Sequence, residues 1–124
     1  MSRILVIDDD AHIRALVQKF LVLDGHEVDT AENGAVGLQL AGLNQYDLVI
    51  TDVIMPERDG LEVVMELKQV SPQLKIIVMT GGGAKFNIDE LLHMTNCMKA
   101  DRGLAKPLDF EKLQATVKEV LEKV

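Results

Sequence analysis

The stretch Ile4-Leu5-Val6-Ile7-Asp8-Asp9-Asp10 joins four consecutive apolar residues to three consecutive acids. A short, β-branched apolar run without polar alternation is typical of a strand buried on both faces of a parallel sheet. Two further runs share this character, Leu48-Val49-Ile50 and Ile76-Ile77-Val78-Met79, and both are followed by polar or glycine residues. The three runs predict the central strands of one parallel sheet.

Two weaker apolar runs, at residues 26–31 and 103–105, predict two further strands. Apolar residues at helical spacing predict a helix after each strand. These helices are expected over 13–21 with Gly25 as the stop, over 35–43, over 61–70, over 88–94, and after Pro107. Right-handed crossovers then place helices on both faces of the sheet. The resulting fold class is α/β, a doubly wound five-stranded parallel sheet of flavodoxin-like order 2-1-3-4-5, with the two weakest runs at its edges.

The length of 124 residues predicts a single domain over residues 1–124 without an output domain. A net charge of −7 disfavours binding to nucleic acid or to an anionic membrane. No run approaches the roughly 20 apolar residues of a membrane span. Cys97 is the only cysteine, so it forms no internal disulfide, and a reducing cytoplasmic location is expected.

Chemistry-bearing residues follow the predicted strands. Asp8 and Asp9 follow the first, Asp52 follows the third, Thr80 the fourth and Lys106 the fifth. Because ligands of open α/β sheets bind beyond the carboxyl ends of the strands, these side chains are expected at one edge. Two unit charges ~4 Å apart interact by roughly 4 kcal/mol at an effective dielectric of about 20, so clustered carboxylates need a counter-charge. Lys106 supplies one positive charge, and a hard divalent cation would supply more.

Oxygen ligands with room for water suit Mg²⁺. A carboxylate beside Mg²⁺ and a lysine can act as a nucleophile toward phosphorus and form an aspartyl phosphate. The Thr80 hydroxyl is placed to donate a hydrogen bond to a phosphoryl oxygen. Capping of the first helix accounts for Asp10. It leaves the other two acids of the run unexplained.

Five sequence pieces occur in a specific order along the predicted strands and helices: Ile7-Asp8-Asp9-Asp10, Thr51-Asp52-Val53-Ile54-Met55-Pro56, Asp59-Gly60, Met79-Thr80 and Lys106-Pro107. With them the chain resembles the response-regulator receiver family of two-component systems over nearly its whole length. It resembles a stand-alone receiver of the kind found in chemotaxis.

The resemblance implies a signalling switch. A sensor histidine kinase or a histidine phosphotransfer protein would phosphorylate Asp52, and the signal would be altered binding to a downstream protein. The protein would not be an enzyme, since it would catalyse only its own phosphorylation and dephosphorylation. Dimerisation that depends on phosphorylation is also compatible with the resemblance.

The resemblance also implies a role for each site residue. Asp9, Asp52 and the backbone carbonyl of Ile54 would bind Mg²⁺, and Asp8 would act through a metal-bound water. Lys106 would contact the phosphoryl group, and Thr80 would move toward it. The Lys106-Pro107 bond resembles one that is cis in the family.

The chain departs from the family pattern at three places. Gly103 occupies the position three residues before the lysine where the family usually has Tyr or Phe. Without that aromatic side chain, the receiver would either signal through backbone shifts alone or have a weak output. Thr80 and Lys106 lie several residues farther apart than is usual in the family, and the extra length falls around the three glycines at 81–83. We expect the loop over residues 81–86 to be poorly ordered without metal or a phosphoryl group. Ile54 borders the path of attacking water and cannot orient it by hydrogen bonding, so slow loss of phosphate is expected.

Two other classes of function remain open. Asp8 and Asp10 have the Asp-x-Asp spacing of haloacid-dehalogenase-like phosphatases, but that reading leaves Asp52 without a role. A receiver-like docking module that is no longer phosphorylated would explain Gly103, although all five acceptor-site residues are present.

Overall fold

The computed structural model describes residues 2–52, 60–80 and 100–122. In this part of the chain the elements are β1 (Arg3–Ile7), α1 (Ala11–Leu23), β2 (Glu27–Ala31), α2 (Gly34–Leu43), β3 (Leu48–Asp52), α3 (Gly60–Val70), β4 (Lys75–Thr80), β5 (Arg102–Ala105) and α5 (Phe110–Glu122). The elements predicted from apolar periodicity in these segments are all present. The predicted helix over residues 88–94 and the glycine loop over 81–86 lie outside the described residues.

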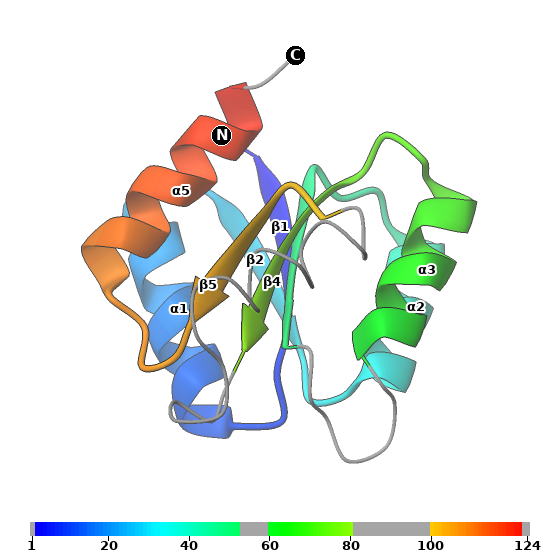
Figure 1. Cartoon of the computed structure of the whole chain (residues 1–124), viewed down its shortest axis with the longest axis horizontal. Helices are drawn as coiled ribbons and strands as arrows, with labels where there is room; N and C mark the ends of the chain where they lie inside the picture. Colours follow the sequence, from blue (N-terminus) through cyan, green and yellow to red (C-terminus); the bar gives the residue numbers. More distant parts are fainter. Residues whose placement is uncertain (1, 53–59, 81–99, 123–124) are drawn as a thin grey trace.

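The five strands form one parallel sheet of order β2-β1-β3-β4-β5, which confirms the predicted topology. Figure 1 shows α1 and α5 on one face of this sheet and α2 and α3 on the other. Ile7 is paired with Thr51, and Thr80 with Ala105. The carboxyl ends of the four strands β1, β3, β4 and β5 therefore lie along one edge.

Alternate residues of each central strand enter two separate cores. Leu5 and Ile7 of β1 pack toward α2 and α3, whereas Ile4 and Val6 pack toward α1 and α5. All four side chains are fully buried. This two-sided burial explains why the central strands are continuous apolar runs without polar alternation.

The ends of the helices follow local signals. Asp10 caps α1, since its Oδ1 accepts hydrogen bonds from the backbone N–H groups of His12 and Ile13 at 2.9 and 3.3 Å. Asn33 caps α2 in the same way through the N–H of Val36. After α1 the chain turns at Gly25, whose φ of +91° is a conformation that favours glycine. Asp10 thus has the capping role expected from the sequence.

None of the helices in residues 2–52, 60–80 and 100–122 has the length and apolar character needed to cross a membrane.

Candidate functional site

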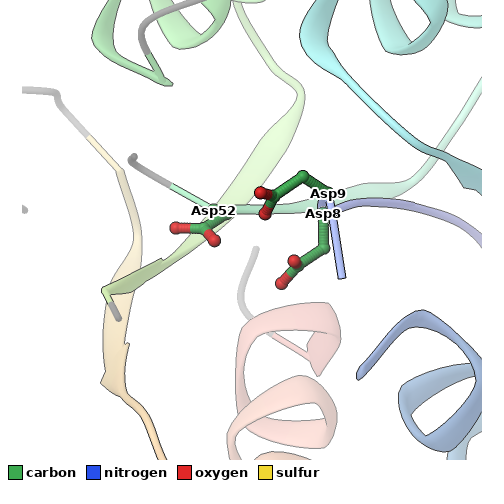
Figure 2. A group of neighbouring side chains, drawn as sticks. All are labelled: Asp8, Asp9 and Asp52. Atoms are coloured by element: carbon green, nitrogen blue, oxygen red, sulfur yellow. The ribbon is translucent and has the colours of Figure 1, made fainter. Parts of the chain in front are cut away.

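Three carboxylates meet at the carboxyl ends of β1 and β3. Asp52 is the last residue of β3, and Asp8 and Asp9 directly follow β1, its neighbour in the sheet. One carboxylate oxygen from each of the three lies within 4.8 Å of the others. In Figure 2 the Asp9 carboxylate extends from its backbone toward Asp52. The sheet thus brings together residues that are more than 40 positions apart, as the strand-end argument predicted.

Lys106 bridges two of these acids. Its Nζ donates hydrogen bonds to Asp8 Oδ2 at 2.6 Å and to Asp52 Oδ2 at 2.9 Å. The backbone N–H of Lys106 donates to the carbonyl of Thr80 at 2.8 Å, which fastens the end of β5 to the end of β4. The Asp8 side chain is fully buried and that of Asp52 is 5% exposed. Lys106 is therefore the counter-charge that the clustered acids require.

Burial changes the ionisation of this group of residues. Desolvation raises the pKa of Asp8, and the hydrogen bonds from Lys106 and from the N–H of Asp10 only partly oppose it. Desolvation also acts to lower the pKa of Lys106, but its hydrogen bonds and charge interactions with Asp8 and Asp52 outweigh this, so its pKa is raised. Lys106 is consequently a firmly held cation at neutral pH.

Asp8 and Asp9 differ in their surroundings. Asp8 is held by Lys106 on Oδ2 and by the backbone N–H of Asp10 on Oδ1, at 2.9 Å. Asp9 is exposed, and its carboxylate makes no hydrogen bond or ion pair with any residue of the described segments. The carboxylate with the fewest competing partners is therefore the one best able to accept a metal ion.

Thr80 and Gly103 occupy the positions that the strand pattern assigned. Thr80 is the last residue of β4 and is 3% exposed, next to Ala105 of β5. Gly103 is half-buried in β5 and paired with Val78. The Lys106-Pro107 bond is cis, as the family resemblance implied. Ile54, whose carbonyl was expected to bind the metal, lies outside the described residues.

Sequence reasoning missed one residue beside the acids. Nη1 of Arg14, on the first turns of α1, donates a hydrogen bond of 2.6 Å to the backbone carbonyl of Asp8. No motif marked this arginine, since an arginine on an amphipathic helix is usually a solvated side chain.

The donor set fits a magnesium ion. All three groups are carboxylates, which are hard oxygen ligands, and Mg²⁺ commonly binds one or two carboxylates while keeping several waters. Asp9 is exposed, so the cluster is reachable from solvent. Asp9 and Asp52 are the residues that would hold the ion, with Asp8 behind them.

A family comparison agrees with this arrangement. Residues 4–118 match the family model of the response regulator receiver domain. The chain belongs to this family. The receiver fold thus accounts for the sheet order and for the cluster at its edge.

Two regulators and two solved structures are similar to this chain. It is 36% identical, over 97% of its length, to the DNA-binding transcriptional regulator NtrC of Azospirillum brasilense, and 36% identical, over 99%, to a CpxR homologue of Haemophilus influenzae. The chain spans only 24% and 52% of these two proteins. Among solved structures, the response regulator TrrA of Thermotoga maritima, in complex with Mg²⁺-BeF, has 37% identity and a TM-score of 0.82 and covers 97% of this chain and 99% of its own. Chemotaxis protein CheY4 of Vibrio cholerae has 29% identity and a TM-score of 0.85, covering 97% of this chain and 98% of its own.

Proposed function

We propose that this receiver accepts a phosphoryl group on Asp52 in a Mg²⁺-dependent reaction. The donor would be the phosphohistidine of a sensor histidine kinase or of a histidine phosphotransfer protein. The observation that carries the proposal is the bridge from Lys106 to Asp8 and Asp52, with the Asp9 carboxylate beside them. In many known sites this combination of a carboxylate, a fixed cation and hard oxygen ligands serves phosphoryl transfer.

The reaction forms a bond between a carboxylate oxygen of Asp52 and phosphorus, and it breaks the bond from phosphorus to the donor nitrogen. The donor histidine leaves as the imidazole and takes up a proton. Lys106 offers its ammonium to the charge on the transferring oxygens, and it is already hydrogen-bonded to the acceptor at 2.9 Å. When bound, Mg²⁺ would supply further neutralisation of that charge.

The switch would act through the strand ends. A phosphoryl group on Asp52 offers Lys106 a new acceptor and competes with its hydrogen bond to Asp8. Thr80 is linked to Lys106 through the 2.8 Å backbone hydrogen bond, so a shift of Lys106 is transmitted to the end of β4. Its hydroxyl would donate a hydrogen bond to a phosphoryl oxygen. The altered surface would change the affinity for a downstream protein.

Acetyl phosphate provides the test of acceptor chemistry. The wild-type chain with Mg²⁺ should gain the mass of one phosphoryl group, and the gain should disappear with EDTA and in the Asp52→Asn variant. Asp8→Asn is the matched control, because the haloacid-dehalogenase-like alternative makes Asp8 the nucleophile. Labelling of Asp52→Asn with loss in Asp8→Asn would refute the proposal. No labelling of the wild type would instead favour the docking-module alternative.

A further inference from the structure

Asp9 combines an exposed side chain with a tightly held backbone. Its carboxylate has no partner among the described residues, yet an oxygen of this group lies within 4.8 Å of oxygens from Asp8 and Asp52. The peptide that follows Asp9 is held by the hydrogen bond from the N–H of Asp10 to Asp8 Oδ1, at 2.9 Å. The direction of the Asp9 side chain is therefore set by its two flanking peptides.

Arg14 holds the peptide that precedes Asp9. Its Nη1 donates at 2.6 Å to the carbonyl oxygen of Asp8, which belongs to the Asp8–Asp9 peptide. Because a peptide unit is planar, the direction of that carbonyl also fixes the N and Cα atoms of Asp9. The backbone N–H of Arg14 donates to the carbonyl of Asp10 at 3.0 Å, so α1 itself anchors the arginine. Arg14, which is not one of the clustered acids, thus helps to hold the backbone at Asp9.

We propose that Arg14 is a positioning residue for the Mg²⁺ site, an inference that rests on the proposed function. Arg14 holds the Asp8–Asp9 peptide so that the Asp9 carboxylate is presented beside Asp52. Residues that orient metal ligands typically contribute 10–100-fold to metal affinity. The positive charge of Arg14 has the opposite effect, since a cation near the site repels Mg²⁺. Positioning and charge therefore predict opposite signs when Arg14 is removed.

Magnesium binding in the absence of any phosphodonor measures this difference. We expect Arg14→Ala to weaken Mg²⁺ binding about tenfold, measured by calorimetry or by amide shifts in NMR spectra. Arg14→Lys should recover most of the affinity, because an ammonium on a stem of similar length still donates to the carbonyl. Arg14→Met keeps the aliphatic stem without a donor and should bind Mg²⁺ as weakly as the alanine variant, which covers the case in which alanine does not fold.

Arg102 provides a matched control. Its Nη1 donates to the backbone carbonyl of Asp101 at 2.8 Å, the same kind of backbone contact, and its Nη2 pairs with Glu119. Arg102 lies at the start of β5 and so at the opposite end of the sheet. Arg102→Ala removes the same charge and should leave Mg²⁺ affinity unchanged. Equal losses in the two alanine variants would overturn the inference, because they would indicate a general effect of removing an arginine.

Two further outcomes separate this inference from the proposed function. Mg²⁺ binding by folded Arg14→Ala and Arg14→Met that is unchanged or tighter than wild type overturns the positioning role, while Asp52 can still be phosphorylated. A wild-type chain that binds no Mg²⁺ and is not labelled overturns the proposed function, and with it the basis of the inference.

Discussion

Gly37 of α2 is expected to resist replacement by alanine. A Cβ atom built at this position of α2 would lie 2.4 Å from Cδ1 and 2.8 Å from Cγ1 of Ile7. Ile7 is fully buried in β1, so its side chain has little room to move away. Gly42, in the same helix, has no atom within 4 Å of the equivalent Cβ. The two glycines therefore form an internal comparison.

The expected magnitudes follow from two opposing terms. Replacing a helical glycine by alanine gains about 0.5–1 kcal/mol from helix propensity. Overpacking a core usually costs about 1–3 kcal/mol. Gly42→Ala should therefore stabilise the chain through the gain in helix propensity alone, whereas Gly37→Ala combines that gain with the cost of overpacking. Because Gly42 is the penultimate residue of α2, it gains at most this propensity term, so the difference between the two variants should be close to the overpacking cost of about 1–3 kcal/mol.

Urea unfolding followed by circular dichroism measures this difference, provided that both variants keep the wild-type m-value. Ile7→Val removes the Cδ1 atom that lies nearest to the added Cβ. In a double-mutant cycle it should destabilise the Gly37→Ala background less than it destabilises the wild type. Equal stability of the two alanine variants, with an additive cycle, would refute the close-approach argument. Because Ile7 directly precedes Asp8, Gly37→Ala should also shift the NMR signals of the acid cluster.

Two further predictions concern ionisation. The pKa of Tyr46, the only tyrosine, is raised to about 12, first by burial and then by its hydrogen bond to Asp29. A raised phenol pKa gives stability that is complete below pH ~10 and is lost as the pH rises through about 12. At pH ~11 the near-ultraviolet absorbance of the folded chain should show ~10% tyrosinate, whereas a tyrosine of ordinary pKa would be ~90% ionised. The tyrosinate fraction should be larger in Asp29→Asn, and an equal fraction in both chains would contradict the role of Asp29. Lys106→Met should destabilise the metal-free chain by about 3 kcal/mol at neutral pH, since it leaves a buried charge without its partner. Because the pKa of Asp8 is raised from 3.8, Asp8 becomes protonated as the pH falls, and the loss of stability in Lys106→Met should then become smaller. A loss of stability that does not depend on pH, or one equal to that of the exposed Lys112→Met, would refute the explanation.

The central strands could be predicted because burial on both faces makes them continuous apolar runs. The strand-end residues could be predicted because they directly follow those runs. Continuous apolar runs located β1, β3 and β4, and parallel topology then placed Asp8, Asp9 and Asp52 at one edge. The edge strands were located less precisely. β2 begins at Glu27 and not at 26, and β5 begins at Arg102 and not at 103. Glu27 is paired with Arg3, and Arg102 with Ile77, and this backbone pairing sets where the two strands begin. A hydrophobicity pattern does not reveal such pairing.

Contacts made by a single long side chain could not be predicted. Lys106 was expected as a counter-charge, but its simultaneous bonds to Asp8 and Asp52 depend on how far its side chain reaches across the strand ends. The contact of Arg14 depends on a backbone carbonyl, which every residue possesses and which therefore leaves no mark in the sequence. The close approach at Gly37 is of the same kind, since a glycine in a helical pattern does not reveal which side chain lies against it.

This contrast suggests how the site is built. Residue types that carry out chemistry recur at strand ends and can be found from the pattern, whereas the residues that orient them act through backbone groups. In this receiver Asp9 is the clearest case, because its carboxylate is free of described partners while both of its flanking peptides are held. A substitution that preserves all three acids but releases either peptide should therefore weaken the site. Substitutions of Arg14 test this expectation, because they release the Asp8–Asp9 peptide and leave all three acids unchanged.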